Sequence, residues 1–438
     1  ARFVVKRSGW YVTATGENLA RAALWLYFSA GSPYVKITHS LILTGDTNKV
    51  WFKDYGIEFK TPAPPAETYC AAGMPGKESI IKARGKEVFL LQDIYPHFAE
   101  REYKAGIGIS ANGSESIVEK FNVAGDWAYG NYGNYGISIV MPWLAERFPK
   151  EISFGERGAR AVLWSGRSGR ELDFRSKTLV GEYWQTWAKA APGKPANPYS
   201  IESNAQGTAL THDIWFIPRP GGYEEAAVRN ISIAAARPPL AMCDPARICS
   251  SEVLGWPSYH RDTKKFPEAE KMISDCWDSL LLSMKAFPMT GVISWGCLPD
   301  ASYVTVNGRI MPALGDSRLK GIMDYGLRRV PFLMYARSGL RECYEYGYRF
   351  SRFTGDYGIA HWNSPNKQRG IFITGDRGGL PFFWQGKTAP YSTIDGEIRH
   401  WLNDYYLTGD ERSLDLIMLV KEGVAKTGKP AHSLISAS

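Results

Sequence analysis

The residues Ala22-Ala-Leu-Trp-Leu-Tyr-Phe28, Ala30-Gly-Ser-Pro33 and Tyr34-Val-Lys-Ile-Thr-His-Ser-Leu-Ile-Leu43 decide the class of this fold. In the first run, every second residue from Ala22 to Phe28 is apolar, and a similar alternation follows from Val35 to Leu43. Successive side chains of a strand point to opposite faces, so both runs are typical of half-buried β-strands. The Gly-Ser-Pro turn between them predicts an antiparallel hairpin.

Outward from this hairpin, the chain up to about residue 235 consists of short β-rich runs separated by Gly, Pro and Asn clusters. Helical periodicity is almost absent from this part, which favours an antiparallel β-sandwich over residues 1–236. The N-terminal residues predict the edge of a strand. Further strands are expected at residues 88–91, 136–141, 159–164 and 209–217.

Beyond the linker Arg237-Pro-Pro239, the apolar residues change to helical spacing. Helices are expected at residues 273–287, 319–330, 394–405 and from residue 414 onward. Two joints share one plan, in which an aromatic helix end precedes Gly339 or Gly409 and a polar first turn follows. Asp410 is suited to cap the last helix. The expected fold is therefore multidomain β and α: an antiparallel β-sandwich, then a partial (α/α) toroid over residues 237–438.

Composition narrows the class of partner. The chain has 438 residues and a net charge of +8, which favours an anionic ligand. The cations are scattered among 44 acidic residues without a basic stripe or a nucleic-acid motif, so nucleic acid is not the expected partner. With 15 Trp and 24 Tyr available to stack on sugar rings, an acidic polysaccharide or oligosaccharide fits better. No apolar run is long enough to predict a membrane span.

The six cysteines contain no C-x-x-C pair, so the sequence predicts neither a zinc site nor redox chemistry. Cys243 and Cys249 are spaced to close a small disulfide loop, with buried single thiols as the alternative.

Several segments follow one another in a recognisable order: residues 24–28, 30–39 and 44–46, 138–143 with 148–150, 161–164 with 172–175, 207–216 and 404–412. In this order they resemble the exo-rhamnogalacturonan lyases (polysaccharide lyase family twenty-six and its bacterial relatives). The resemblance implies a central β-sandwich, an (α/α) toroid and cleavage of an acidic rhamnogalacturonan-like glycan by β-elimination. Members of that family begin with a further small β-barrel and have a longer toroid, so the toroid here is expected to be incomplete.

Elimination at a uronate needs a base, a cation to neutralise the carboxylate and an acid for the leaving oxygen. The catalytic candidates are His361, in a Gly-rich loop past a helix end, His260, Arg377 and Tyr391. Substrate binding is predicted for Trp384, Trp362, Tyr357 and Arg399. His400 is expected to be a packed or solvated helix residue. No organic cofactor is expected; no motif indicates Ca²⁺, although some lyases use it.

Two other functions stay open on the residues alone. Asp395 and Glu397 would be the carboxylates of a glycoside hydrolase on the same toroid, although they are close in sequence and Asp395 equally suits a helix cap. A catalytically silent glycan-binding or structural protein is the third alternative. Whichever function holds, the resemblance implies an extracellular or cell-surface protein, or a cytoplasmic one if it acts on imported oligosaccharides.

Overall fold

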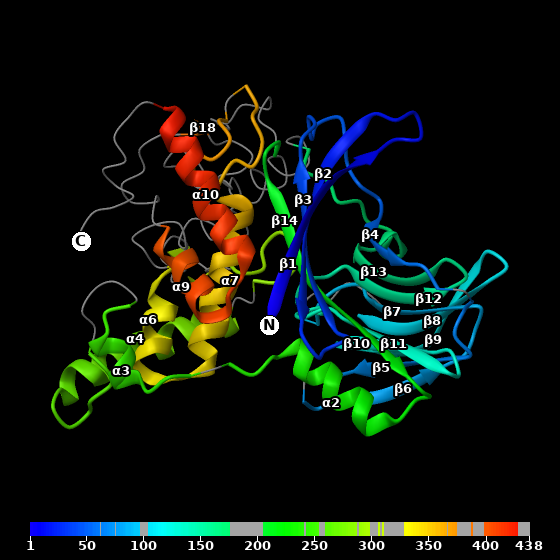
Figure 1. Ribbon diagram of the computed structural model, residues 1–438, viewed down its shortest axis with the longest axis horizontal. Coiled ribbons are helices and arrows are strands. Elements are labelled where there is room, and N and C mark those ends of the chain that lie inside the picture. The colour runs from blue at the N-terminus through cyan, green and yellow to red at the C-terminus, as the bar shows by residue number, and fades with distance from the viewer. Residues whose placement is uncertain are drawn as a thin grey trace.

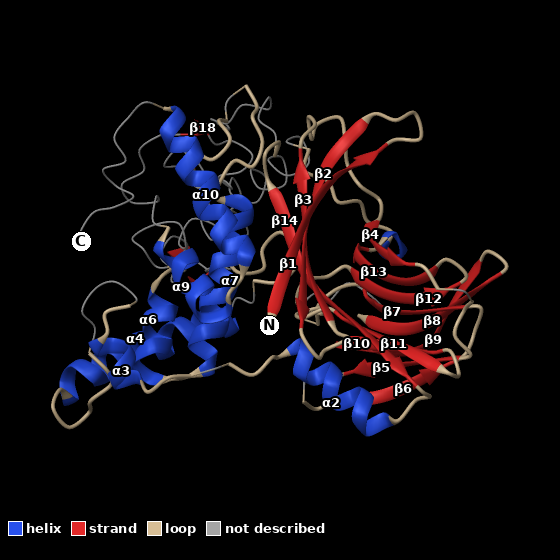
Figure 2. Ribbon diagram, viewed as in Figure 1, coloured by secondary structure: helices blue, strands red, loops and turns tan. Residues whose placement is uncertain are grey.

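Two antiparallel sheets and a group of helices form the protein (Figure 2). The computed structural model describes residues 1–61, 63–74, 76–96, 104–175, 205–240, 242–253, 259–286, 289–297, 305–306, 309–310, 328–365, 367–374, 387–388 and 398–427.

The larger sheet has eight strands and contains the hairpin that the sequence predicts. In spatial order its strands are β1 (Arg2–Val12), β2 (Asn18–Ser29), β3 (Val35–Leu43), β14 (Ala209–Pro220), β11 (Tyr135–Val140), β10 (Ala124–Asn131), β5 (Glu67–Ala72) and β6 (Ser79–Ala83). β2 and β3 pair antiparallel with Leu24 opposite His39, and β1 is the edge strand expected at the N-terminus. β10 and β11 form a hairpin whose turn lies in the Gly-, Asn- and Tyr-rich stretch from Gly130 to Gly136.

The second sheet has six strands and packs face to face against the first. Its order is β4 (Tyr55–Phe59), β13 (Gly158–Trp164), β12 (Lys150–Gly155), β7 (Glu87–Gln92), β8 (Ala105–Ala111) and β9 (Ser114–Phe121). One apolar core takes residues from both sheets, such as Ile37 and Leu41 from β3 and Leu90 and Ile152 from β7 and β12. The strands predicted at residues 88–91, 136–141, 159–164 and 209–217 are thereby confirmed to within a few residues.

A helix within the first half was not predicted. α2 (Glu225–Ala236) packs Val228 and Ala235 against the outer face of the eight-stranded sheet, beside Trp127 and Tyr129. η1 (Gly166–Ser168) is a single 3-10 turn. The expectation that helical periodicity is almost absent before residue 235 is therefore wrong for this segment.

After the linker the chain is mainly helical. The helices are α3 (Pro245–Ser250), α4 (Pro267–Ala286), α6 (Val330–Ser338), α7 (Arg341–Tyr357), α9 (Arg399–Thr408) and α10 (Glu411–Lys426). Two-residue strands also form the pairs β15 (Thr305–Val306) with β16 (Arg309–Ile310) and β17 (Ile373–Thr374) with β18 (Lys387–Thr388). The helix expected at residues 319–330 lies outside the described residues except for its end.

The two predicted joints are confirmed. Gly339 ends α6 with φ 72° and Gly409 ends α9 with φ 67°, both in the left-handed conformation that glycine adopts without strain. Asp410 caps α10 by accepting a hydrogen bond from the backbone N–H of Arg412. α6 with α7 and α9 with α10 form two helical hairpins beside the eight-stranded sheet (Figure 1). A closed ring of such hairpins stays a prediction.

All six cysteines are free thiols, so the disulfide considered between Cys243 and Cys249 is not formed. Within the described part of the chain, no helix has both the length and the apolar character needed to cross a bilayer.

Both faces of the central strands β2, β3 and β14 are covered. Residues at one set of alternate positions, such as Leu41 and Ile214, enter the sandwich core. Residues at the other set, such as Tyr27, Thr38 and Asp213, are also buried. Tyr27 and Asp213 bond to residues of the helical hairpins, and Thr38 bonds to Asp213 on the neighbouring strand. The candidate functional site lies on this second face, which points away from the sandwich core and toward the helices.

Candidate functional site

A groove with a cavity volume of about 400 Å³ lies between the eight-stranded sheet and the helical hairpins. Its aromatic lining residues are Tyr27, Tyr34, Trp143, Trp215, Tyr344 and Tyr348. Its charged lining residues among those described are Arg2, Lys36, Arg237 and Arg341, with the carboxylates Asp213, Glu345 and Asp410. Flat rings and charged groups are the side chains that recognise an acidic sugar.

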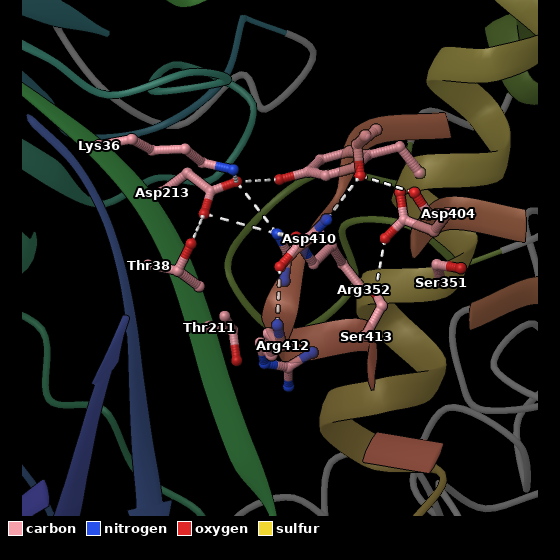
Figure 3. Close-up of polar contacts among 12 residues, drawn as sticks. Lys36, Thr38, Thr211, Asp213, Ser351, Arg352, Asp404, Asp410, Arg412 and Ser413 are labelled. Carbon is pink, nitrogen blue, oxygen red and sulfur yellow. Dashed lines mark hydrogen bonds and ion pairs between the residues drawn. The ribbon is translucent and has the colours of Figure 1, made fainter. Parts of the chain in front are cut away.

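Asp213 of β14 is the sheet's main contact with the helices at the floor of this groove. Thr38 Oγ1 donates to its Oδ1 at 2.5 Å, and Tyr348 of α7 donates to Oδ2. Arg352 Nη2 lies 3.2 Å from Oδ2, and Lys36 Nζ lies 3.5 Å from the same oxygen. Four donors from one neighbouring strand and one helix therefore converge on this single carboxylate (Figure 3).

Asp410 approaches the same guanidinium from the helical side. Arg352 Nη2 also forms a buried ion pair with Asp410 Oδ2. The hydroxyl of Tyr27 donates to Asp410 Oδ1 at 2.9 Å, and that oxygen also accepts the helix-capping bond from Arg412 N at 2.9 Å. Arg352 thus joins a carboxylate of the sheet to the carboxylate that begins α10 (Figure 3).

The network fixes the protonation of its members. Burial alone would raise the pKa of Asp213, but the charges of Arg352 and Lys36 outweigh it and hold that pKa below its usual range. The same cations lower the pKa of Asp410 against the effect of burial. Burial and the neighbouring carboxylates raise the pKa values of Tyr27 and Tyr348 far above that of an exposed tyrosine. At neutral pH both carboxylates are ionised and both phenols keep their protons.

A second buried cluster extends this interface away from the groove. Asp356, at the end of α7, accepts bonds from the backbone N–H and the hydroxyl of Thr211 at 2.8 and 2.6 Å. Arg412 forms an ion pair with Asp356, and its Nε donates to Ser40 Oγ at 3.2 Å. Because a buried charge is costly unless it is paired, the two clusters hold the sheet and the hairpins in one relative position.

The rim of the groove has more positive than negative charge at one point, where two arginines share one glutamate. Glu345 Oε1 accepts hydrogen bonds from Arg237 Nη2 at 2.7 Å and from Arg341 Nε at 2.8 Å. One carboxylate is thereby shared by two guanidinium groups, which leaves a net positive charge at this point. Arg341 also donates to the carbonyl of Pro238, which ties the linker to α7.

His361 is buried and lies away from the groove lining. Its Nε2 is 2.6 Å from the carbonyl oxygen of Gly355, and its backbone N–H donates to Gly207. Burial, together with the charge of Arg412, lowers the pKa of His361 to about 3. The ring is therefore neutral and its Nε2–H donates to Gly355, so this catalytic candidate is a buried loop histidine and does not line the groove.

The other predicted residues that the structure describes are scattered. His260 is exposed in the loop before α4, and Arg399 is the half-buried first residue of α9. Tyr357 is buried and donates to the carbonyl of Val292 at 3.1 Å. Trp362 packs edge-on against Trp10 with ring centroids 5.7 Å apart. None of these four lines the groove.

Arg377, Tyr391 and Trp384, with the alternative carboxylates Asp395 and Glu397, lie outside the described residues. His400 is buried in α9 beside Trp401, which is the packed one of the two helix positions expected for it. No cluster of three or more His, Cys, Asp or Glu side chains that would hold a metal ion occurs in the described ranges.

Sequence reasoning missed the residues that form the groove floor. Lys36 and Asp213 occupy the polar positions of alternating strands, which alternation alone assigns to solvent, so no local signal singles them out. Arg352 lies within the buried C-terminal part of α7, from Phe350 to Tyr357. Asp410 was recognised only as a helix cap.

Comparison with known proteins does not assign this protein to a family. No family model matches the sequence, and no curated protein matches it. Among solved structures, a protein assigned as an aldose 1-epimerase from Escherichia coli K12 is 9% identical over 50% of this chain, with a TM-score of 0.20. The match spans 65% of that other chain. A likeness at this level identifies neither a family nor an activity.

Proposed function

We propose that this protein binds an acidic polysaccharide in the groove between the sheet and the hairpins and cleaves it by β-elimination at a uronate. The observation that carries the proposal is the groove lining, in which aromatic rings and an excess of cations surround two tyrosines that hold their protons. The choice of elimination, and of a rhamnogalacturonan-like glycan, rests on the family resemblance of the sequence.

The charges favour an anionic ligand. Four cations and three carboxylates line the groove, and Arg352 adds a further positive charge behind Asp213 and Asp410. Arg237 and Arg341 share one carboxylate at the rim, so a guanidinium there is able to bind a uronate carboxylate through two parallel hydrogen bonds. Neutralising that carboxylate acidifies the C5 proton, which elimination transfers to a base. The ionised carboxylates of Asp213 and Asp410 are the proton acceptors that we assign in the groove.

Tyr348 suits the role of proton donor to the leaving oxygen. It lines the groove, and its phenol is kept protonated by burial and by the carboxylate of Asp213 to which it donates. A general acid must hold its proton until the leaving oxygen develops charge. Tyr27 is a second candidate, because it also lines the groove and its hydroxyl donates to Asp410.

A hydrolase is less well supported at this position. Hydrolysis by two carboxyl groups requires one that stays protonated to act as the acid. Asp213 and Asp410 are the carboxyl pair at the groove floor, and the same guanidinium lowers the pKa of both. Neither is therefore suited to supply the acid.

The same proposal includes two further predictions from the sequence. One is an extracellular or cell-surface location, and the other is the completion of the hairpins into a toroid.

The proposed function is tested by incubating the purified protein with polygalacturonate, rhamnogalacturonan and a neutral galactan. Ultraviolet absorbance from an unsaturated uronate should grow with an acidic polymer and not with the galactan. New reducing ends without absorbance would show hydrolysis instead. Binding of an acidic polymer with neither product would show a glycan-binding protein and would contradict the enzymatic proposal.

A further inference from the structure

Trp143 lies in the groove wall with an unusual backbone. Its φ is 63°, in the left-handed region that a bulky residue rarely adopts, because its Cβ crowds the neighbouring backbone. Asn112 and Glu252 are the other non-glycine residues with positive φ in the described part of the chain, and neither lines the groove. Strained backbone persists where the surrounding structure enforces it, and it concentrates at ligand sites.

The turn that carries Trp143 is held by Asp126 of β10, which is buried. The carbonyl oxygen of Asp126 accepts from Met141 N at 2.8 Å, and its carboxylate Oδ1 accepts from Leu144 N at 2.9 Å. On the far side of the turn, Arg147 N donates to the carbonyl of Trp143 at 3.0 Å. Hydrogen bonds on both sides of residue 143 therefore maintain its conformation.

One face of the Trp143 ring is already occupied. The guanidinium carbon of Arg349 lies 4.1 Å from the ring centroid, in a cation–π contact. Arg349 Nη1 is fixed in turn by Glu146 at 2.8 Å, which also accepts from the indole N–H of Trp295 at 3.0 Å. Trp295 also contacts the indole of Trp143, with ring centroids 5.9 Å apart. The indole is therefore held in place by its neighbours, and it is half-buried where it lines the groove.

We propose that Trp143 is the stacking platform for a pyranose ring of the glycan, seated beside the uronate that the cationic residues bind. A flat, immobilised indole loses no conformational freedom on binding, and it matches a sugar face on which several C–H groups lie together. Asp126 and Arg349 are positioning residues for this platform. The inference deepens the proposed function and rests on it, because it assumes that a glycan occupies the groove.

The test replaces Trp143 by glycine, which removes the ring and adopts the left-handed backbone without strain. Binding of rhamnogalacturonan and polygalacturonate oligosaccharides is measured by titration calorimetry for the wild type, Trp143→Gly and Trp143→Phe. We expect Trp143→Gly to weaken binding by about tenfold, equivalent to about 1.4 kcal/mol, and Trp143→Phe to lie in between.

Trp51→Ala is the matched control. Arg175 stacks on Trp51 at 4.1 Å, the same separation as in the Arg349 and Trp143 pair, but Trp51 does not line the groove. This control should bind as the wild type does. If Trp143→Gly also binds as the wild type does, the stacking role is wrong while the proposed function stands. If the wild type binds no oligosaccharide, the proposed function fails and the platform fails with it.

Discussion

Arg352 is the residue on which the junction of sheet and hairpins depends. Its guanidinium is almost fully buried and contacts Asp213 from the sheet and Asp410 from the last hairpin. Removing ions from water is costly, and the cost is recovered only where each charge keeps its partners. A single cation between two carboxylates therefore makes the position of the groove floor sensitive to one side chain.

Replacement of Arg352 by leucine should destabilise the protein strongly. The substitution leaves two buried carboxylates facing each other with only Lys36 nearby, so the free energy of unfolding should fall by about 3–5 kcal/mol. Urea unfolding at pH 7 measures the change. Arg369→Leu, which breaks the exposed pair with Glu422, is the control and should cost less than about 1 kcal/mol. Equal losses in the two variants would contradict this role of Arg352.

Tyr348→Phe should slow cleavage more than it weakens binding. The variant removes the phenol that we assign as the proton donor and keeps the ring in the groove lining. Loss of a general acid lowers kcat by about 100-fold or more, with KM little changed. The rate of absorbance growth on the acidic polymer measures both constants. Tyr406→Phe alters an exposed tyrosine of α9 and should leave them unchanged. An unchanged kcat in Tyr348→Phe would exclude this donor.

His361 should make the protein less stable in acid. Its pKa is about 3 in the folded state because it is buried, whereas an unfolded histidine titrates near 6.5. Between these values the unfolded state binds the extra proton, so stability is greatest above about pH 6.5 and falls as the pH is lowered. His361→Gln keeps a donor for Gly355 and should reduce the slope by up to about 1.4 kcal/mol per pH unit. Unfolding curves from pH 4 to pH 7 measure it, and equal slopes would contradict the assignment.

At the scale of elements, the sequence predicts those strands and helix ends that are determined by residues close to one another along the chain. Alternation predicts β2, β3 and β14, and the glycines at 339 and 409 predict the two helical joints. α2 was missed because its Ala-rich stretch follows a long series of strands and has a narrow apolar face. The second buried face of β14, which carries Thr211 and Asp213, is polar, so alternation alone describes it as solvent-exposed.

The start of α10 should depend on more than its cap. Asp244 caps α3 at an exposed position by accepting from Ala246 N at 3.0 Å, so Asp244→Ala should cost about 1 kcal/mol. Asp410→Ala removes a similar cap together with the partners of Tyr27 and Arg352, and it should cost about 3 kcal/mol or more. Chemical denaturation of both variants measures the difference. Matching losses would mean that Asp410 acts only as a cap.

At the scale of the whole molecule, the groove was predictable in place but not in its residues. The change from strand to helix spacing near Arg237 predicts a sheet region followed by helical hairpins, and the groove lies between these two parts. Its floor joins Lys36, Asp213, Tyr348 and Asp410, which are distant in sequence and meet only through the packing of sheet on helices. Local patterns contain no information about such contacts. This is why His361 and His260, chosen from their loops, lie elsewhere.

The central claim is that this groove binds an acidic glycan, and the most direct measurement is a crystal structure of Tyr348→Phe with a bound rhamnogalacturonan oligosaccharide. We predict one sugar ring stacked on Trp143 and a uronate carboxylate on Arg237 or Arg341, with residue 348 next to the glycosidic oxygen. An oligosaccharide bound at another surface, with the groove free of sugar, would contradict the account.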